Sequence, residues 1–94
     1  MSETQTISVI VTGRVQGVSY RAWTQSEARA RGLAGSVRNR DDGTVEAVFS
    51  GAPEAVAEMA ALCRSGPPGA RVTDVAARDG GDVPRGGEFR ILRD

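Results

Sequence analysis

The stretch GRVQGVSYR, residues 13–21, has the composition of an anion-binding loop. β-Branched residues precede it, and no glycine or proline interrupts the chain from its end to Gly32, so it is expected to join a strand to a helix. A strand that turns through glycines into a helix start leaves several backbone N–H groups unpaired and pointing one way. Arg21 would add a fixed charge and a planar fork of donors. Together these groups describe a cradle for an anion, and phosphate fits it best.

The same spacing also allows a plainer interpretation, in which Gly13 and Gly17 only make a tight turn and Arg21 is solvated. Spacing alone leaves both interpretations open. If the cradle forms, its donors are the backbone amides of residues 14–20, completed by Arg21. Ser19 is expected to cap the following helix or to contact the phosphate. It is not expected to be a nucleophile, because the sequence has no histidine to activate it.

A second polar residue, Asn39, falls at the end of a predicted strand, on the face that it shares with Val37. An amide on a core-facing row needs hydrogen-bond partners. Asn39 could orient a water with its carbonyl oxygen and a substrate oxygen with its NH₂ group. Alternatively it could cap the turn at residues 41–43, and the spacing alone favours this cap.

Other reactive residue types are scarce in this sequence. The absence of histidine removes the commonest general base and the commonest metal ligand. The pairs Asp41/Asp42 and Asp79/Asp82 lie in predicted turns, where carboxylates cap the backbone, so we expect no metal site. Cys63 lies on an apolar helical stripe and is expected to be a packed thiol. No GxxxxGK[ST] motif is present to bring a nucleotide and Mg²⁺.

Length and charge limit the partners. The 94 residues fit one small domain, and 12 basic against 12 acidic residues give no electrostatic case for nucleic acid or an anionic membrane. A single cysteine excludes an internal disulfide, and residues 1–6 are polar, so a reduced cytoplasmic location is the simplest expectation. No apolar run approaches the length of a membrane span. We expect a monomer, since no feature marks an interface.

The elements that position these groups can be read from the apolar periodicity and the turn signals. Residues 1–6 are expected to be a loose tail before a single domain at residues 7–94. Predicted strands cover residues 7–13, 35–40, 44–50, 72–78 and 88–92. One predicted helix covers residues 20–31, and a second begins at Pro53 and is stopped by residues 65–69. Residues 79–87 are expected to be a polar turn. This order, βαββαβ plus a short terminal strand, predicts an α+β ferredoxin-like split βαβ sandwich, with two helices on one face of an antiparallel sheet.

The two motifs resemble those of a known family. Residues 13–21 are similar to the first acylphosphatase signature, which reads glycine, any residue, VQGV, any residue, aromatic, arginine. The second signature appears as GSVRN at residues 35–39, with Gly43, Val45 and Gly51 at the family's spacing, and Gly32-Leu33 between the two motifs also matches. The resemblance covers Ile7 to Leu92, and the length fits a free-standing member.

The resemblance assigns roles by position. The family's phosphate-binding arginine falls on Arg21 and its water-orienting asparagine on Asn39. The family's cradle of main-chain amides falls on Val15, Gln16, Gly17, Val18, Ser19 and Tyr20. The implied activity is hydrolysis of acyl phosphates to carboxylate and phosphate, with no metal or cofactor.

Two departures from the family pattern are visible. Ser36 stands where the family usually has an aromatic residue, which is expected to loosen packing beside the site. Tyr20 replaces the commoner phenylalanine and is expected to fill the same space.

The alternative function is a non-catalytic ferredoxin-like module that binds an anion or a partner. RNA binding by this fold would require exposed aromatic residues and a basic surface. The aromatic residues of this chain are all expected to lie in the core: Tyr20, Trp23, Phe49 and Phe89.

Overall fold

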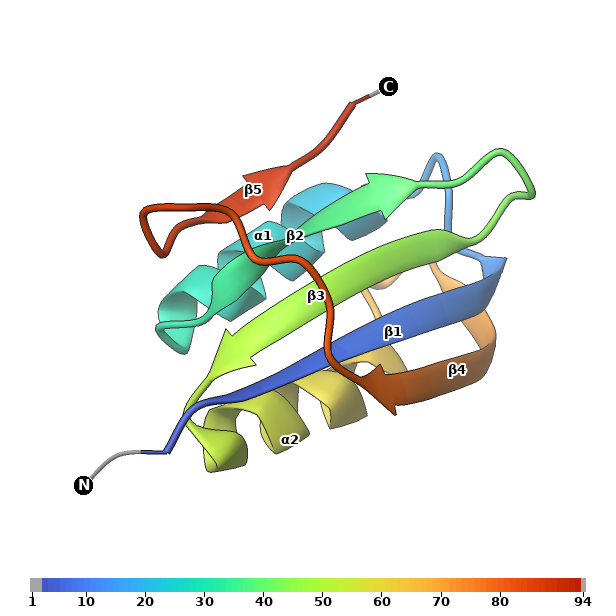
Figure 1. Cartoon of the computed structure of the whole chain (residues 1–94). Coiled ribbons are helices and arrows are strands. Elements are labelled where there is room, and N and C mark those ends of the chain that lie inside the picture. The colour runs from blue at the N-terminus through green and yellow to red at the C-terminus, as the bar shows by residue number, and fades with distance from the viewer. Residues whose placement is uncertain (1–2, 94) are drawn as a thin grey trace.

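The computed structural model describes residues 3–93 as two layers, a sheet and two helices that cover one of its faces (Figure 1). In chain order the elements are β1 (Gln5–Arg14), α1 (Tyr20–Ala30), β2 (Ala34–Asn39), β3 (Val45–Gly51), α2 (Pro53–Cys63), β4 (Arg71–Asp79) and β5 (Phe89–Ile91). The predicted element order and the ferredoxin-like fold class are confirmed. Neither helix is long and apolar enough to cross a membrane in the described part of the chain.

The strands lie in the order β4-β1-β3-β2-β5. The pairs β1–β3, β1–β4 and β2–β3 are antiparallel, as predicted, whereas β5 runs parallel to β2. The sheet is therefore mixed. The reason is the connection at residues 80–88, which leaves the end of β4 and crosses the face of the sheet that the helices leave open (Figure 1). Since it reaches the far edge at the end where β2 begins, β5 must run in the same direction as β2.

The core lies between the sheet and the helices. Alternate residues of the central strands face it, because successive side chains of a strand point to opposite faces. The apolar periodicity predicts the core faces of β1, β3 and α2, and nine of these residues are buried: Ile7, Val9, Val11, Val45, Ala47, Phe49, Val56, Met59 and Cys63. Ala60, also predicted on the apolar stripe of α2, is only partly buried. Phe89 of β5 stacks on Phe49 with ring centroids 5.6 Å apart, so the terminal strand is anchored to the same core.

The first strand begins earlier than the apolar pattern indicates. Gln5 pairs with Gly51 and Thr6 pairs with Ser50, so the expectation of a loose tail is wrong at these two positions. The Thr6 and Ser50 hydroxyls are 2.8 Å apart and hydrogen-bonded. Backbone pairing does not require apolar side chains, and so hydrophobic periodicity misses this end of the strand. Residues 1 and 2 of the expected tail lie outside the described residues.

Candidate active site

The loop at residues 15–19 leaves the sheet through a bulge in β1. The register of β1 against β4 shifts between Thr12 and Gly13. Gly13 has a φ of 129°, and a Cβ at this position would collide with the carbonyl oxygen of Arg71. Only glycine fits such a close backbone approach, so the first residue of the motif directs the chain out of the ladder and toward α1.

The backbone of the loop has a conformation that suits an anion cradle. Gly17 and Ser19 have left-handed conformations, with φ of 75° and 64°. Alternation of left-handed and right-handed residues gathers successive N–H groups around a concavity. Within residues 3–93, no amide of residues 15–19 donates a hydrogen bond to another protein group. The positive end of the α1 dipole adds to the field of these unpaired donors.

Ser19 occupies the N-cap position of α1 without capping it through its side chain. Its carbonyl oxygen accepts a hydrogen bond from the Trp23 amide at 3.0 Å, but its hydroxyl makes no cap hydrogen bond. The reason is the left-handed backbone, because a side-chain cap requires an extended conformation at this residue. The expected side-chain cap is therefore wrong, and the hydroxyl stays available to a ligand in the loop.

Three side chains fix the loop against the rest of the molecule. Val15 is buried in the core, and Val18 packs against it. The Gln16 side-chain amide donates to the carbonyl oxygens of Arg40 at 2.8 Å and Thr44 at 2.9 Å. Gln16 thus ties the loop to the β2–β3 hairpin, and one of its two contacts is to Arg40, the residue that follows Asn39.

The start of α1 is fixed by Tyr20, which fills a core position as expected. Its hydroxyl donates to the carbonyl oxygen of Cys63, the last residue of α2, at 2.7 Å. Burial raises the pKa of the Tyr20 hydroxyl well above its usual value, and burial raises the pKa of the Cys63 thiol to about 11. Both groups remain protonated at neutral pH. The prediction that Cys63 is a packed thiol is confirmed by its complete burial.

Asn39 is the last residue of β2 and has an unsatisfied polar atom. Its Oδ1 is buried and has no hydrogen-bond partner in the described part of the protein. The turn that Asn39 was expected to cap is instead held by Asp42, whose Oδ1 accepts from the Thr44 amide at 3.0 Å and from the Thr44 hydroxyl at 2.6 Å. These hydrogen bonds hold the pKa of the Asp42 carboxyl below its usual value. The turn role predicted for this aspartate is confirmed, and the cap role for Asn39 is wrong.

A cavity of about 330 Å³ brings the loop and Asn39 together. The loop and the start of α1 contribute Val15, Gly17, Ser19, Tyr20, Arg21 and Ala22, and the facing strands contribute Asn39, Ile91 and Arg93. Arg21 is half-buried and has no hydrogen bond or ion pair within residues 3–93. Gln16 lines an adjoining cavity, and Val18 lines neither.

Three of these lining residues were not identified from the sequence. Ala22, Ile91 and Arg93 belong to neither motif. The face of Arg93 could have been inferred, because it follows the inward-facing Ile91 by two residues. The neighbouring strand could not, since nothing local to residues 89–93 says that they pair with β2.

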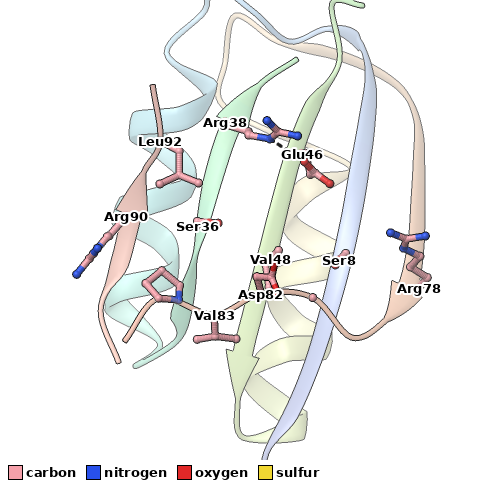
Figure 2. Close-up of a pocket in the computed structure, with 12 residues that line it drawn as sticks. Ser8, Ser36, Arg38, Glu46, Val48, Arg78, Asp82, Val83, Arg90 and Leu92 are labelled. Carbon is pink, nitrogen blue, oxygen red and sulfur yellow. Dashed lines mark hydrogen bonds and ion pairs between the residues drawn. The ribbon is translucent and has the colours of Figure 1, made fainter. Parts of the chain in front are cut away.

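A larger cavity of about 570 Å³ lies on the open face of the sheet, beneath the connection at residues 80–88 (Figure 2). Ser36 lies here, beside Val48, and not beside the loop as expected. Its side chain points away from those of Val37 and Asn39 because neighbours in a strand alternate. Arg38 on the same face pairs with Glu46 at 2.8 Å.

Known proteins are similar to this chain in sequence and in fold. A family model described as Acylphosphatase matches residues 7–91. The chain is 54% identical over 91 residues to an acylphosphatase of Bradyrhizobium diazoefficiens, with 92% of each chain covered. Among solved structures, it is similar to an acylphosphatase from Bacillus subtilis, with 37% identity, a TM-score of 0.86, and coverage of 97% of this chain and 100% of the other. An acylphosphatase from Coxiella burnetii matches with 31% identity and a TM-score of 0.87, over 95% of this chain and 93% of the other.

Proposed function

Because the chain belongs to the acylphosphatase family, we propose that it hydrolyses acyl phosphates by means of a water oriented by Asn39, while Arg21 and the loop amides hold the phosphoryl group. The observation that carries this proposal is one cavity lined by three kinds of unsatisfied group. Within residues 3–93, these are the unpaired amides of Val15, Gly17 and Ser19, the unpartnered Arg21 guanidinium and the buried Oδ1 of Asn39.

The phosphoryl group is held by donors that the fold has already oriented. The loop amides and the Arg21 fork suit its oxygens, and the amides keep their geometry when the substrate is absent, since the bulge at Gly13 and the Gln16 hydrogen bonds fix the loop. Preorganised donors stabilise the charge that grows on these oxygens in the transition state, and removal of one such donor lowers kcat by about 10²–10³.

The water is held by the other half of the cavity. A buried amide oxygen without a partner costs about 1–3 kcal/mol. A water that donates to Asn39 Oδ1 removes this cost and places its own oxygen toward the phosphorus. As the water oxygen bonds to phosphorus, the bond from phosphorus to the acyl oxygen breaks, and its electron pair leaves with the carboxylate.

The proton of the attacking water requires no protein base. The sequence has no histidine, and Tyr20 and Cys63 stay protonated at neutral pH. The acyl phosphate has a good leaving group, so the reaction depends on positioning and charge stabilisation more than on strong base catalysis. The proton is taken by an oxygen of the substrate's own phosphoryl group, and the products are carboxylate and phosphate.

Phosphate release from benzoyl phosphate by the purified protein tests this proposal, in the presence and absence of EDTA. We expect hydrolysis well above the spontaneous rate, unchanged by EDTA. Inorganic phosphate binding without hydrolysis would support the alternative, a non-catalytic anion-binding or partner-binding module. If EDTA abolished hydrolysis, the reaction would require a metal ion and the metal-free mechanism would be wrong.

The proposal also includes a monomer in the cytoplasm that binds no nucleic acid. The burial of the single thiol and the balanced charge support this part of the proposal. Light scattering coupled to size-exclusion chromatography measures the mass in solution, and a dimer would contradict it.

A further inference from the structure

Building on the proposed function, we propose that Arg93 is a second phosphate-binding guanidinium, which the segment after β5 brings to the cavity that Arg21 lines. Both arginines line the cavity of about 330 Å³, together with Asn39. They come from distant parts of the sequence and from different elements, α1 for Arg21 and the residues after β5 for Arg93.

The parallel pairing of β5 places Arg93 at the site. Ile91 is in register with Val37, and the Leu92 amide continues the ladder by donating to the Val37 carbonyl oxygen at 2.8 Å. In this register Arg93 falls beside Asn39. Because strand residues alternate, Arg93 shares the helix-side face with Ile91, whereas Arg90 and Leu92 lie toward the open face and line its cavity (Figure 2).

The charge of Arg93 is not compensated by the described residues. It forms no hydrogen bond or ion pair within residues 3–93, and no carboxylate of that part of the chain lines the cavity. The adjoining cavity, which Arg21 and Arg93 also line, adds Arg40 and one carboxylate, Asp41. Counted over the described residues, the local charge is positive in both cavities that Asn39 lines.

The ligand supplies the matching charge. A phosphate monoester carries about 1.5 to 2 negative charges at pH 7, and a phosphoryl ligand of this kind exceeds what Arg21 alone neutralises. Two guanidinium groups on different walls can each take phosphoryl oxygens that the loop amides do not reach. In this arrangement Arg93 strengthens both the binding of phosphate and the stabilisation of the transition state.

The matched pair Arg93→Gln and Arg90→Gln tests the assignment. The two positions flank the end of the same short strand, carry the same side chain and face opposite sides of the sheet. Inorganic phosphate is titrated by isothermal calorimetry, and kcat and KM are measured with benzoyl phosphate. For Arg93→Gln we expect the Kd of phosphate to rise about tenfold and kcat/KM to fall by a similar factor, as for loss of one charged hydrogen bond. Arg93→Lys should fall between, since it keeps the charge without the fork.

Arg90→Gln should bind phosphate with the wild-type affinity. An unchanged Kd in Arg93→Gln, or an equal weakening in Arg90→Gln, overturns the assignment. Arg90 and Arg93 are both exposed, so neither Arg90→Gln nor Arg93→Gln should alter the melting temperature. If the wild-type protein binds phosphate in an Arg93-dependent manner but hydrolyses nothing, this assignment stands and the proposed function fails. If the protein hydrolyses benzoyl phosphate and Arg93→Gln leaves kcat/KM unchanged, the proposed function stands and the assignment of Arg93 fails.

Discussion

The loop cavity and the open-face cavity contain similar residues and differ in how their polar groups are satisfied. Both are lined by arginine and serine, and the open-face cavity is the larger, at about 570 Å³ against about 330 Å³. In the open-face cavity Arg38 pairs with Glu46, and the Ser8 hydroxyl donates to the Gly80 carbonyl oxygen at 2.6 Å. The first of these contacts joins β2 to β3, and the second joins β1 to the crossing connection.

The loop cavity has the opposite character. Arg21, the Ser19 hydroxyl and Asn39 Oδ1 have no partner within residues 3–93, and of these three groups only Oδ1 is buried. Folded proteins rarely leave a buried polar atom unsatisfied, because it lowers stability. The unsatisfied Oδ1 of Asn39 therefore favours the loop cavity as the site, whereas cavity volume alone would favour the open face.

The largest expected effect is at Arg21. Arg21→Ala should lower kcat/KM for benzoyl phosphate by about 10³, because a charge-stabilising fork is lost from the transition state. Its matched control on the other face is Arg38→Ala, which should retain kcat/KM within about threefold, since its partner there is Glu46 and not substrate. Equal losses in the two variants would show that the two cavities do not differ as proposed.

Asn39 should separate catalysis from phosphate binding. Asn39→Ala should lower kcat by about 10² while the inhibition constant of inorganic phosphate changes little, since the replaced group holds water. The loss of a hydrogen-bonded buried amide would lower the melting temperature. Asn39→Ala should not lower it in this way, because Oδ1 has no hydrogen-bond partner within residues 3–93. A wild-type kcat would refute the role assigned to Asn39.

Gln16 tests whether the loop cavity depends on preorganisation. Gln16→Leu removes both hydrogen bonds that tie the loop to the carbonyl oxygens of Arg40 and Thr44. We expect kcat/KM to fall about tenfold and the free energy of unfolding to fall by about 1–2 kcal/mol. Full activity at reduced stability would mean that the loop keeps its shape without this tether.

Ser36 gives the smallest effect and concerns the other cavity. Ser36→Phe would place an aromatic ring beneath the connection at residues 80–88, near the apolar side chains of Val83 and Leu92, which are 37% and 40% exposed. Burial of this surface should raise the free energy of unfolding by about 1 kcal/mol. The kcat should be unchanged. A lower kcat would show that a change on the open face affects catalysis in the loop cavity.

Much of the loop cavity was predictable because its signals are local. Glycines that mark a strand-to-helix turn, an arginine at the helix start and an asparagine on an inward-facing row all follow from spacing of a few residues. The two motifs together then favoured Arg21 and Asn39 over the plainer alternatives. Alternation also placed Ser36 on the face opposite Asn39, and the expectation that it lies beside the site overlooked this signal.

The sequence by itself determined the order of the elements, the inward face of each strand and the residues of the cradle. Tertiary structure alone decided that β5 runs parallel to β2, that Gln16 reaches the hairpin and that Arg93 stands beside Asn39. The physical reason is that periodicity and turn chemistry are properties of neighbouring residues, whereas these contacts depend on where the chain crosses the sheet. The same distinction applies to the unsatisfied Oδ1 of Asn39, because a polar atom is known to lack a partner only after every distant segment has been placed.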